Sequence, residues 1–543
     1  MDRYQFFLRR NPDMPEGEPE RSSATVTPSL AKYSGPWNRR TIAHLLRRAV
    51  VAPTYAEMQA ASTKSMDELI DMLLSPNAAA TAPHGWCGDC VGNPNVPWYD
   101  QRFDLIDAFN IELRRWWYQQ MVNTNLSLQE RMTIFWHNHF ATNAIVLYDP
   151  RLIYFQNQIL RQRALGSFRD LVRAVTMDKS MLMFLDGKYS KNNGYVNENY
   201  ARELQELFTI GISDNDGTPN YTQADIREAA RTLTGWDWLG YGPAGGDPAS
   251  NLLTGHDPTD KKLYGRTITG NTDGAPELEQ LLDIIFNREE TARYVIRKLY
   301  RFLVHTDVTL TPVYPIAPEI EENIIAPLAT EFRSANWNIS VVLRRLLTCE
   351  HFYEDDIIGS TLKSPTDLLV GAVRGMRTAP LAGNPGDHVF EIMQDRAVTL
   401  GQKLFFPPGV QGWKHYRNWI STSTLPQRHL YTDQLINGVP VTLTIRPAAL
   451  FPDSVQFASG TAIIDTLAFA KQFPSFSDPE ALVADIAGHM LAYAPSQKLL
   501  DRLLYELVAD RAYEWKDAPD EAKTIRLRAM LRYLMRSTNY QLM

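Results

Sequence analysis

The stretch from Gln129 to Trp236 constrains this chain most, because it places imidazoles and carboxylates inside apolar, helical sequence. It begins QERMTIFWHNHFAT, where His137 and His139 are surrounded by isoleucine, phenylalanine and tryptophan. A packed helix normally buries carbon at such positions, and a polar group is costly to bury unless it is paired or ligated. The stretch therefore predicts a buried polar site between helices.

The composition is that of a large globular protein. The chain has 543 residues, of which 44% are hydrophobic and 22% are charged, and its net charge is −7 at pH 7. This charge gives no general attraction to nucleic acid, so no nucleic-acid partner is expected. No window approaches the roughly 18 to 20 apolar residues of a membrane helix, and no export signal follows the arginines at 9–10. We expect no membrane association and a cytoplasmic location, although an unrecognised export route would leave no such trace.

Apolar residues recur at helical spacing along most of the chain, which predicts a mainly α fold. We expect one large multi-helix body with long glycine-rich loops, including a single helix over 150–177. An Asn-Gly pair between β-branched runs predicts one small β-hairpin near 432–450. Three regions are expected: an extended arm over 1–35, a helical core region over 36–275 that carries the histidine and glutamate motifs, and a C-terminal helical region over 276–543 packed on it.

His137 and His139 are the first candidate functional residues. Two positions apart on an ideal helix, they point about 200° away from each other, so both reach one metal ion only if the helix bends there. One could then be a ligand while the other supports the site. The alternative is a pair of structural histidines that bond to backbone carbonyls or to carboxylates.

A second candidate set lies on one helix face, because Asn199, Glu203 and Glu206 follow one another at spacings of four and three residues. Two carboxylates one turn apart can bind a divalent cation or divide acid and base roles. Asp186 and Glu228 could complete such a site. The Glu-x-x-His spacing of a carboxylate-bridged two-metal site is absent from these helices.

The alternative for this carboxylate set is a structural ion-pair network, since buried pairs can hold helices in register. Its candidate partners are Arg202, Arg227 and Arg231. His256 and Asp257 lie in a glycine-flanked loop, where functional residues are common. Their alternative is a simple turn, which an Asp-Pro pair favours.

Three further motifs are weaker. Cys87 and Cys90 have the redox C-x-x-C spacing, but no βαβ pattern surrounds them and no second pair exists to bind zinc. A local disulfide or inert thiols are the alternatives. The segment DNDGTPNYTQAD (214–225) imitates a calcium loop, yet Pro219 stands where the sharp turn needs glycine. No motif predicts a nucleotide cofactor.

Several motifs in order along the chain are similar to one known family. They are AHLLRRA (43–49), RMTIFWHNHFAT (131–142), NENYARELQELFTIGI (197–212), YTQADIREAARTLTGW (221–236), GHDPTDKKLYGRTITG (255–270) and LGQKLFFPPGVQGWKHYRNWISTSTL (400–425). Together they resemble the bacterial domain of unknown function 1800 family. The resemblance implies a large, mainly helical protein, often encoded beside a sulfatase- or phosphatase-like partner and often exported. The sequence VVAPT after AHLLRRA departs from the pattern, where a glycine-containing turn is expected.

These observations favour a metal-dependent enzyme, a hydrolase or an oxidoreductase, with a site between helices and a divalent ion of unknown identity. The alternative is a non-catalytic binding or scaffold protein in which the same residues form a buried structural network. In the enzyme hypothesis the predicted metal ligands are His137, His139, Glu203 and Glu206. The predicted catalytic residues are Glu203, Glu206, His139 and Asp186, and the supporting residues are Asn199, Glu228, Arg202, His256 and Asp257.

Overall fold

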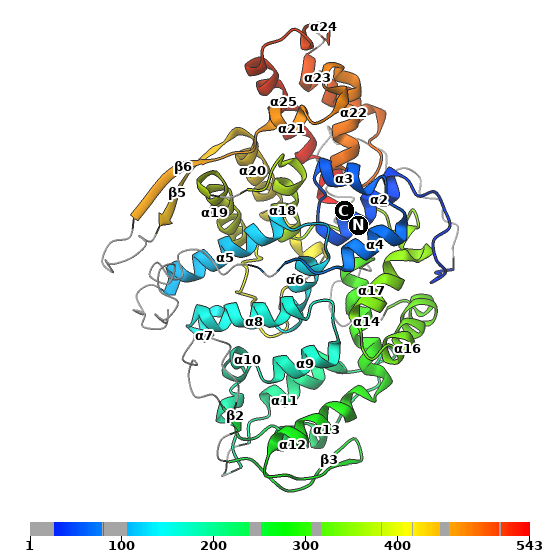
Figure 1. The fold of residues 1–543 in the computed structure, drawn as a ribbon, viewed down its shortest axis with the longest axis vertical. Coiled ribbons are helices and arrows are strands. Elements are labelled where there is room, and N and C mark those ends of the chain that lie inside the picture. The colour runs from blue at the N-terminus through cyan, green and yellow to red at the C-terminus, as the bar shows by residue number, and fades with distance from the viewer. Residues whose placement is uncertain are drawn as a thin grey trace.

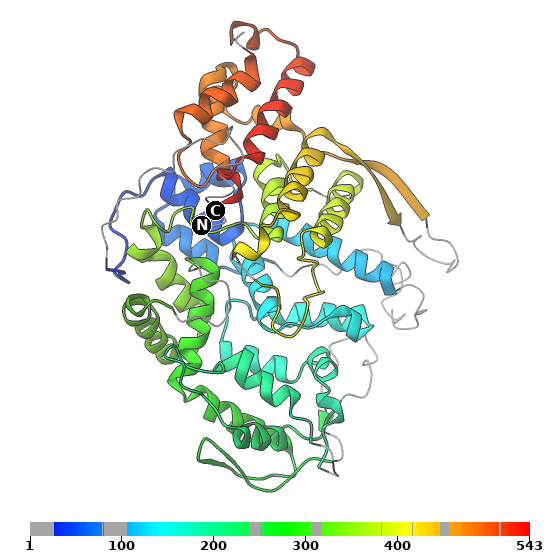
Figure 2. The same ribbon diagram turned by 180° about the vertical axis from the view of Figure 1, so that it is seen from behind.

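A computed structural model gives the arrangement of most of the chain. It describes residues 27–78, 80, 106–192, 194, 196–237, 251–252, 255–306, 316–381, 383–414, 416–445, 456–509 and 512–543. The described residues form an elongated body built almost entirely from helices (Figure 1), and the view from behind shows the same arrangement (Figure 2). The predicted mainly α fold is therefore confirmed. Cys87, Cys90 and residues 1–26 of the predicted N-terminal arm lie outside the described residues.

The first part of the chain forms α2 (Arg39–Val50), α3 (Tyr55–Ala61), α4 (Met66–Leu74), α5 (Ile106–Asn123), α6 (Gln129–His139), α7 (Ala144–Leu147), α8 (Pro150–Gln162), α9 (Phe168–Thr176) and α10 (Lys179–Phe184). Polar residues begin several of these helices. Thr54 and Ser65, for example, each form a capping box with a glutamate three residues later. The single helix expected over 150–177 is instead two helices, because Ser167 caps the start of α9.

The middle of the chain forms η2 (Gly187–Tyr189), α11 (Asn199–Glu203), the π-helix η3 (Leu204–Thr209), α12 (Gln223–Thr232), α13 (Gly274–Phe286), α14 (Glu289–Leu303), α15 (Pro318–Ile320), the π-helix η4 (Glu321–Ile325), α16 (Ala326–Ser334), α17 (Ile339–Thr348) and η5 (Glu350–Tyr353). Thr222 caps α12 as the sequence predicts, in a capping box with Asp225. These helices occupy the lower half of the body in Figure 1.

The last part forms α18 (Pro365–Met376), α19 (Gly383–Thr399), η6 (Tyr416–Trp419), α20 (Thr424–Asn437), α21 (Thr466–Ala470), η7 (Pro474–Ser477), α22 (Pro479–Met490), α23 (Gln497–Val508), α24 (Ala512–Trp515), α25 (Asp520–Arg536) and η8 (Asn539–Gln541). Helices α22 to α25 form the upper end of the body in Figure 1. The residues at the C-terminal end return to the middle, where Leu542 forms an antiparallel bridge with Leu362.

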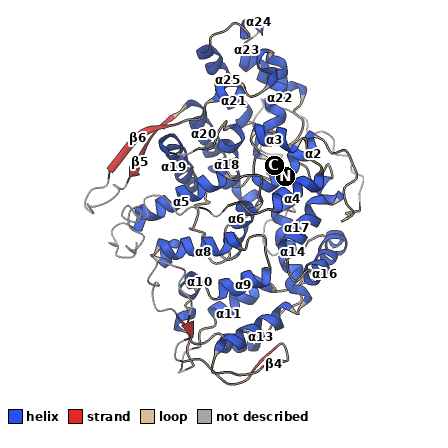
Figure 3. Ribbon diagram, in the orientation of Figure 1, coloured by secondary structure: helices blue, strands red, loops and turns tan. Residues whose placement is uncertain are grey.

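The described strands form short antiparallel pairs, which are β1 (Trp236–Asp237) with β2 (Asn251–Leu252), β3 (Lys261–Leu263) with β4 (Arg266–Ile268), and β5 (Val439–Ile445) with β6 (Gln456–Ala462). The last pair projects from the side of the body (Figure 3). A hairpin is therefore present, but its predicted Asn-Gly turn is wrong. Asn437 ends α20, and Gly438 follows with φ of 85°, so this glycine terminates a helix instead of joining two strands.

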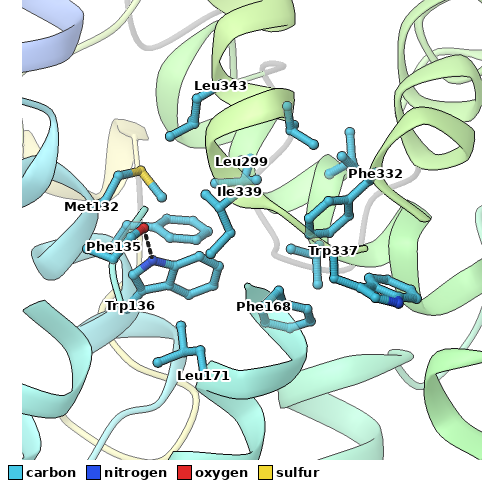
Figure 4. Packing of buried hydrophobic residues seen from close by; sticks show 14 of the residues in the cluster. Met132, Phe135, Trp136, Phe168, Leu171, Leu299, Phe332, Trp337, Ile339 and Leu343 are labelled. Carbon is cyan, nitrogen blue, oxygen red and sulfur yellow. Dashed lines mark hydrogen bonds between the residues drawn. The ribbon is translucent and has the colours of Figure 1, made fainter. Parts of the chain in front are cut away.

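Helix α6 lies between the two hydrophobic cores of the described protein. Met132, Phe135 and Trp136 belong to one core, whereas Ile134 belongs to the other. A helix that is apolar on both sides must be buried on both sides. Trp136 is fully buried beside Phe168, and its indole N–H donates to the Ala164 carbonyl over 3.0 Å (Figure 4).

Apolar packing continues across residue 275, where the sequence predicts a boundary between two regions. The ring centroids of Phe168 on α9 and Phe286 on α13 are 5.6 Å apart. Among the described helices, none combines the length and apolar character that crossing a membrane requires.

Replacing Trp136 with phenylalanine should lower the free energy of unfolding by about 2–4 kcal/mol, because the variant leaves a void and an unpaired Ala164 carbonyl. Urea unfolding followed by circular dichroism measures this change. Ile525→Ala, at a side chain that is 61% exposed, is the control and should leave the midpoint nearly unchanged. A Trp136 variant as stable as the parent would show that α6 does not organise the core.

Candidate functional site

Helix α6 sends its two histidines into different cores. The His137 ring is 1% exposed and lies 5.2 Å from the Trp117 ring, 5.3 Å from Phe405 and 5.5 Å from Trp413, measured between centroids. His139 is also buried, and its Nε2–H donates to the Phe208 carbonyl over 3.0 Å. The helix does not bend to bring the two imidazoles together. They therefore do not form the predicted pair of ligands to one metal ion.

Burial keeps both histidines neutral near physiological pH. It lowers the pKa of His137 to about 3. Burial also lowers the pKa of His139 well below its usual value, helped by the positive charge of Lys298 and opposed by the hydrogen bond to Phe208. Neutral imidazoles among aromatic rings behave here mainly as packing groups, and His139 adds one directed hydrogen bond.

The acceptor of that bond belongs to an unusual segment, since the helix that begins with α11 continues as the π-helix η3. The wider turn leaves carbonyl oxygens without the ordinary helical donors. The Tyr294 hydroxyl donates to the Leu207 carbonyl over 3.0 Å, and the Lys298 ammonium group approaches the same oxygen at 3.5 Å. His139 supplies the donor to Phe208. Side chains from α14 and α6 thus supply donors to two carbonyl groups of η3.

Glu203, the last residue of α11, carries a half-buried carboxylate. Burial raises its pKa to about 7, and the charge of Glu206 adds to this shift while Arg202 opposes it. Within the part of the chain that the structure describes, this carboxylate has no hydrogen bond or ion pair. A group with a pKa near neutrality, held without a partner, is suited to give and take a proton.

Glu206 is in a different state, although it lies less than one turn further along. Its carboxylate accepts hydrogen bonds from the Tyr221 hydroxyl and, at 3.4 Å, from Arg202. Arg202 also binds Glu198 over 3.1 Å. Burial and the Glu206 charge raise the pKa of Tyr221, which keeps its hydroxyl protonated as the donor. This part of the face matches the predicted ion-pair network.

Lys298 is a second group whose pKa is shifted toward neutrality. Burial lowers it to about 7, and the nearby Arg301 contributes to the shift. Burial also raises the pKa of Tyr294 against the effect of Arg301, and the charge of Glu203 adds to that rise. Tyr294 therefore lies within electrostatic reach of Glu203 while it shares the Leu207 carbonyl with Lys298. A carboxyl group and an amine with shifted pKa values flank η3.

The other residues predicted for this site lie apart or are already engaged. Asp186 is exposed, with φ of 58°, at the start of η2, and Asn199 is exposed in the first turn of α11. Glu228 accepts from Arg231 over 2.8 Å and from the Lys262 backbone N–H over 2.8 Å. It therefore connects α12 to β3.

His256 and Asp257 belong to a separate buried cluster. The His256 Nε2 atom lies 3.2 Å from a Glu277 carboxylate oxygen, and Glu277 also forms an ion pair with Lys261. The side chains of Glu277 and Lys261 have no exposed surface. Burial tends to raise the pKa of Asp257, but hydrogen bonds from Thr259 and Arg231 outweigh it and lower the pKa to about 2. The cluster fixes the 255–270 segment on α12 and α13.

The predicted four-ligand metal site is not formed. Among the described residues, no group of three or more histidine, cysteine, aspartate or glutamate side chains is arranged to hold a metal ion. The calcium-like segment uses Asp214 to accept from the backbone N–H groups of Asp216 and Thr218 over 3.0 and 2.8 Å, which is a turn. The binding of a divalent metal ion to this protein stays a prediction.

Sequence reasoning did not identify Lys298, Tyr294 or Tyr221 beside the carboxylates, nor Lys261 and Glu277 beside His256. A signal existed for two of them. Tyr294 and Lys298 are spaced by four residues on α14, which places them on one helix face. Their partners lie far away along the chain, so the spacing alone could not identify the contact.

These features define a mainly α protein whose central helices bury an extensive set of polar side chains. Residues 44–542 match the model of a family described as a protein of unknown function (DUF1800), and the chain belongs to this family. The resemblance inferred from the WHNHF and NENYAREL motifs is thereby confirmed. No curated protein and no solved structure matches the chain.

The burial of His137 should make the free energy of unfolding depend on pH in the acidic range. Because its folded pKa is lowered to about 3, below an unfolded value of about 6.5, the unfolded chain takes up the proton first. Stability is therefore lost as the pH falls from 6.5 toward 3. His137→Leu should lose about 1.5 kcal/mol less than the parent between pH 6.5 and 5, as measured by urea unfolding at each pH.

The control for this comparison is Phe140→Leu, which changes packing in the same helix region without removing a titrating group. Its loss between the two pH values should equal that of the parent. An unchanged pH dependence in His137→Leu would mean that the imidazole is already protonated, or exposed, in the folded protein.

Proposed function

We propose that the protein is an enzyme in which Glu203 acts as the general acid–base group. The observation that carries the proposal is the state of its carboxylate, which is half-buried, has a pKa raised to about 7 and has no hydrogen bond or ion pair among the described residues. Structural carboxylates in the same region, such as Glu206 and Glu228, are paired. A carboxyl group kept unpaired in this way is typical of a proton-transferring residue.

The surrounding groups support a reaction that moves a proton, such as hydrolysis or group transfer. Arg202 holds Glu206 beside Glu203, and the negative charge of Glu206 favours the protonated form of Glu203. Lys298, with a pKa of about 7, offers a second group that can exchange a proton near neutrality. The predicted ligands do not gather around one ion, so the proposal assigns no step to a metal.

Glu203→Gln tests the proposal through stability as well as activity. The folded pKa is raised, so the Glu203 contribution to stability is present at low pH and is lost as the pH rises through 7. Gln resembles the protonated acid and avoids this loss. At pH 8 the variant should be more stable than the parent by about 1–2 kcal/mol, a value reduced for the partial solvent screening of the group. At pH 4.5 the two should be nearly equal.

Glu206→Gln is the matched control. It weakens the contacts to Tyr221 and Arg202, so it should lower stability by about 1 kcal/mol. Urea unfolding at both pH values gives the stabilities, and hydrolysis of chromogenic esters, phosphoesters and glycosides gives the activity. The proposal fails if Glu203→Gln destabilises the protein at pH 8 or leaves a measured hydrolytic activity intact.

A second candidate function is a binding or scaffold protein, and one observation favours it. His139, Tyr294 and Lys298 all bond to carbonyls of η3, which is what a structural network would do. In this candidate the sulfatase- or phosphatase-like partner implied by the family resemblance is the molecule that is held. It predicts that Glu203→Gln lowers stability at pH 8, the opposite sign from the enzyme proposal.

A further inference from the structure

A cavity of about 70 Å³ lies in the middle of the molecule, apart from Glu203. Helix α6, the C-terminal end of α14, the first turn of α18 and the segment 361–364 border it. A space of this size holds a few water molecules or one small ligand. Glu203 and the predicted metal ligands do not belong to its lining, whereas Arg131, Ile134 and Asn138 of the RMTIFWHNHFAT motif do.

Buried hydrogen-bond donors without acceptors border this cavity. The Thr366 hydroxyl belongs to a residue that is 3% exposed, and the Thr361 hydroxyl is also buried. The Arg131 Nε–H is a third buried group, and none of the three has a hydrogen-bond partner among the described residues. Leaving a donor buried and unpaired is unfavourable. Because an arginine N–H can only donate, a ligand that satisfies all three must offer acceptor oxygens.

The carboxylates in the lining are already engaged. Asp367 forms an ion pair with Arg131 and accepts from the Ser364 backbone N–H over 2.9 Å. Glu130 accepts from Arg161 over 2.6 Å and from the Trp117 indole N–H over 3.0 Å. The N-terminus of the 12-residue helix α18 also faces the cavity and contributes a positive potential there. An anionic group in the cavity would therefore be favoured. The acids in the lining are already paired, the positive end of the α18 helix dipole faces the space, and unpaired donors border it.

Part of the remaining wall is apolar, since Val50, Ile134 and Phe302 also border the space. Inorganic phosphate would place polar oxygens against this carbon surface, whereas a short aliphatic chain would bury itself there. We propose that the cavity binds the carboxylate of a small organic acid, with the carboxylate on Arg131, Thr361 and Thr366 and the carbon chain against the apolar wall. This site is independent of the acid–base role of Glu203.

Binding of propionate to the full chain, measured by isothermal titration calorimetry and by the shift in melting temperature, tests the proposal. Propionamide and inorganic phosphate are the comparison ligands. The parent should bind propionate at least tenfold more tightly than either one. Equal binding of phosphate, or no binding of propionate at millimolar concentration, would overturn the proposal and leave a cavity that holds only water.

Thr366→Val separates ligand binding from folding. Its hydroxyl has no partner in the free protein, so the nearly isosteric change should leave the melting temperature without ligand unchanged or higher. It should weaken propionate binding about tenfold, the effect of one hydrogen bond to a charged group. Thr291→Val is the control, because the Thr291 hydroxyl is bonded to the Ile285 carbonyl over 2.6 Å. That variant should be less stable and bind propionate normally; unchanged binding in Thr366→Val would contradict the proposal.

Discussion

The arrangement around the centre of this protein depends on how the carbonyl groups of the π-helix η3 find donors. A π-helical turn cannot satisfy its own last carbonyls in the ordinary helical pattern. His139 from α6 and Tyr294 and Lys298 from α14 supply the donors to Phe208 and Leu207. Three segments far apart in sequence are thereby fixed to one another. The same contacts engage the Nε2 atom of His139 and place the Lys298 amine next to the helix.

Glu203 is the exception in this arrangement. Most buried or half-buried carboxylates nearby are paired: Glu206 with Tyr221 and Arg202, and Glu228 with Arg231. Glu203 stands at the junction of α11 and η3 with its pKa raised to about 7 and its carboxylate unpaired among the described residues. A neutral side chain at this position would cost less free energy to bury. An unfavourable group retained at a helix irregularity is a common property of functional sites. Glu203 is therefore a better candidate for a functional residue than the two histidines.

Away from η3, buried ion pairs also fix separate segments of the chain to one another. Lys261 and Glu277 connect the 255–270 segment to α13, and Arg131 and Asp367 connect α6 to α18. Such pairs contribute little net stability, because desolvation offsets their attraction, but breaking one leaves an uncompensated buried charge. They therefore favour one arrangement of the helices over its alternatives. The ion pair between Arg131 and Asp367 lies beside the small cavity, and unpaired donors remain there. The proposed ligand site therefore lies next to an ion pair that fixes α6 to α18.

The sequence by itself determined the mainly α fold, the family, the capping of α12 by Thr222 and the opposite directions of His137 and His139, because helical spacing and local caps act within a few residues. It also located Glu203 and Glu206 on one face. Only the tertiary structure decided which polar groups are paired. The contact of His139 with Phe208 and the engagement of His256 by Glu277 join separate segments, and the π-helix that separates the environments of Glu203 and Glu206 depends on donors from α14. Residue spacing carries no information on such long-range contacts, and burial, which sets the pKa values, exists only after the helices have packed.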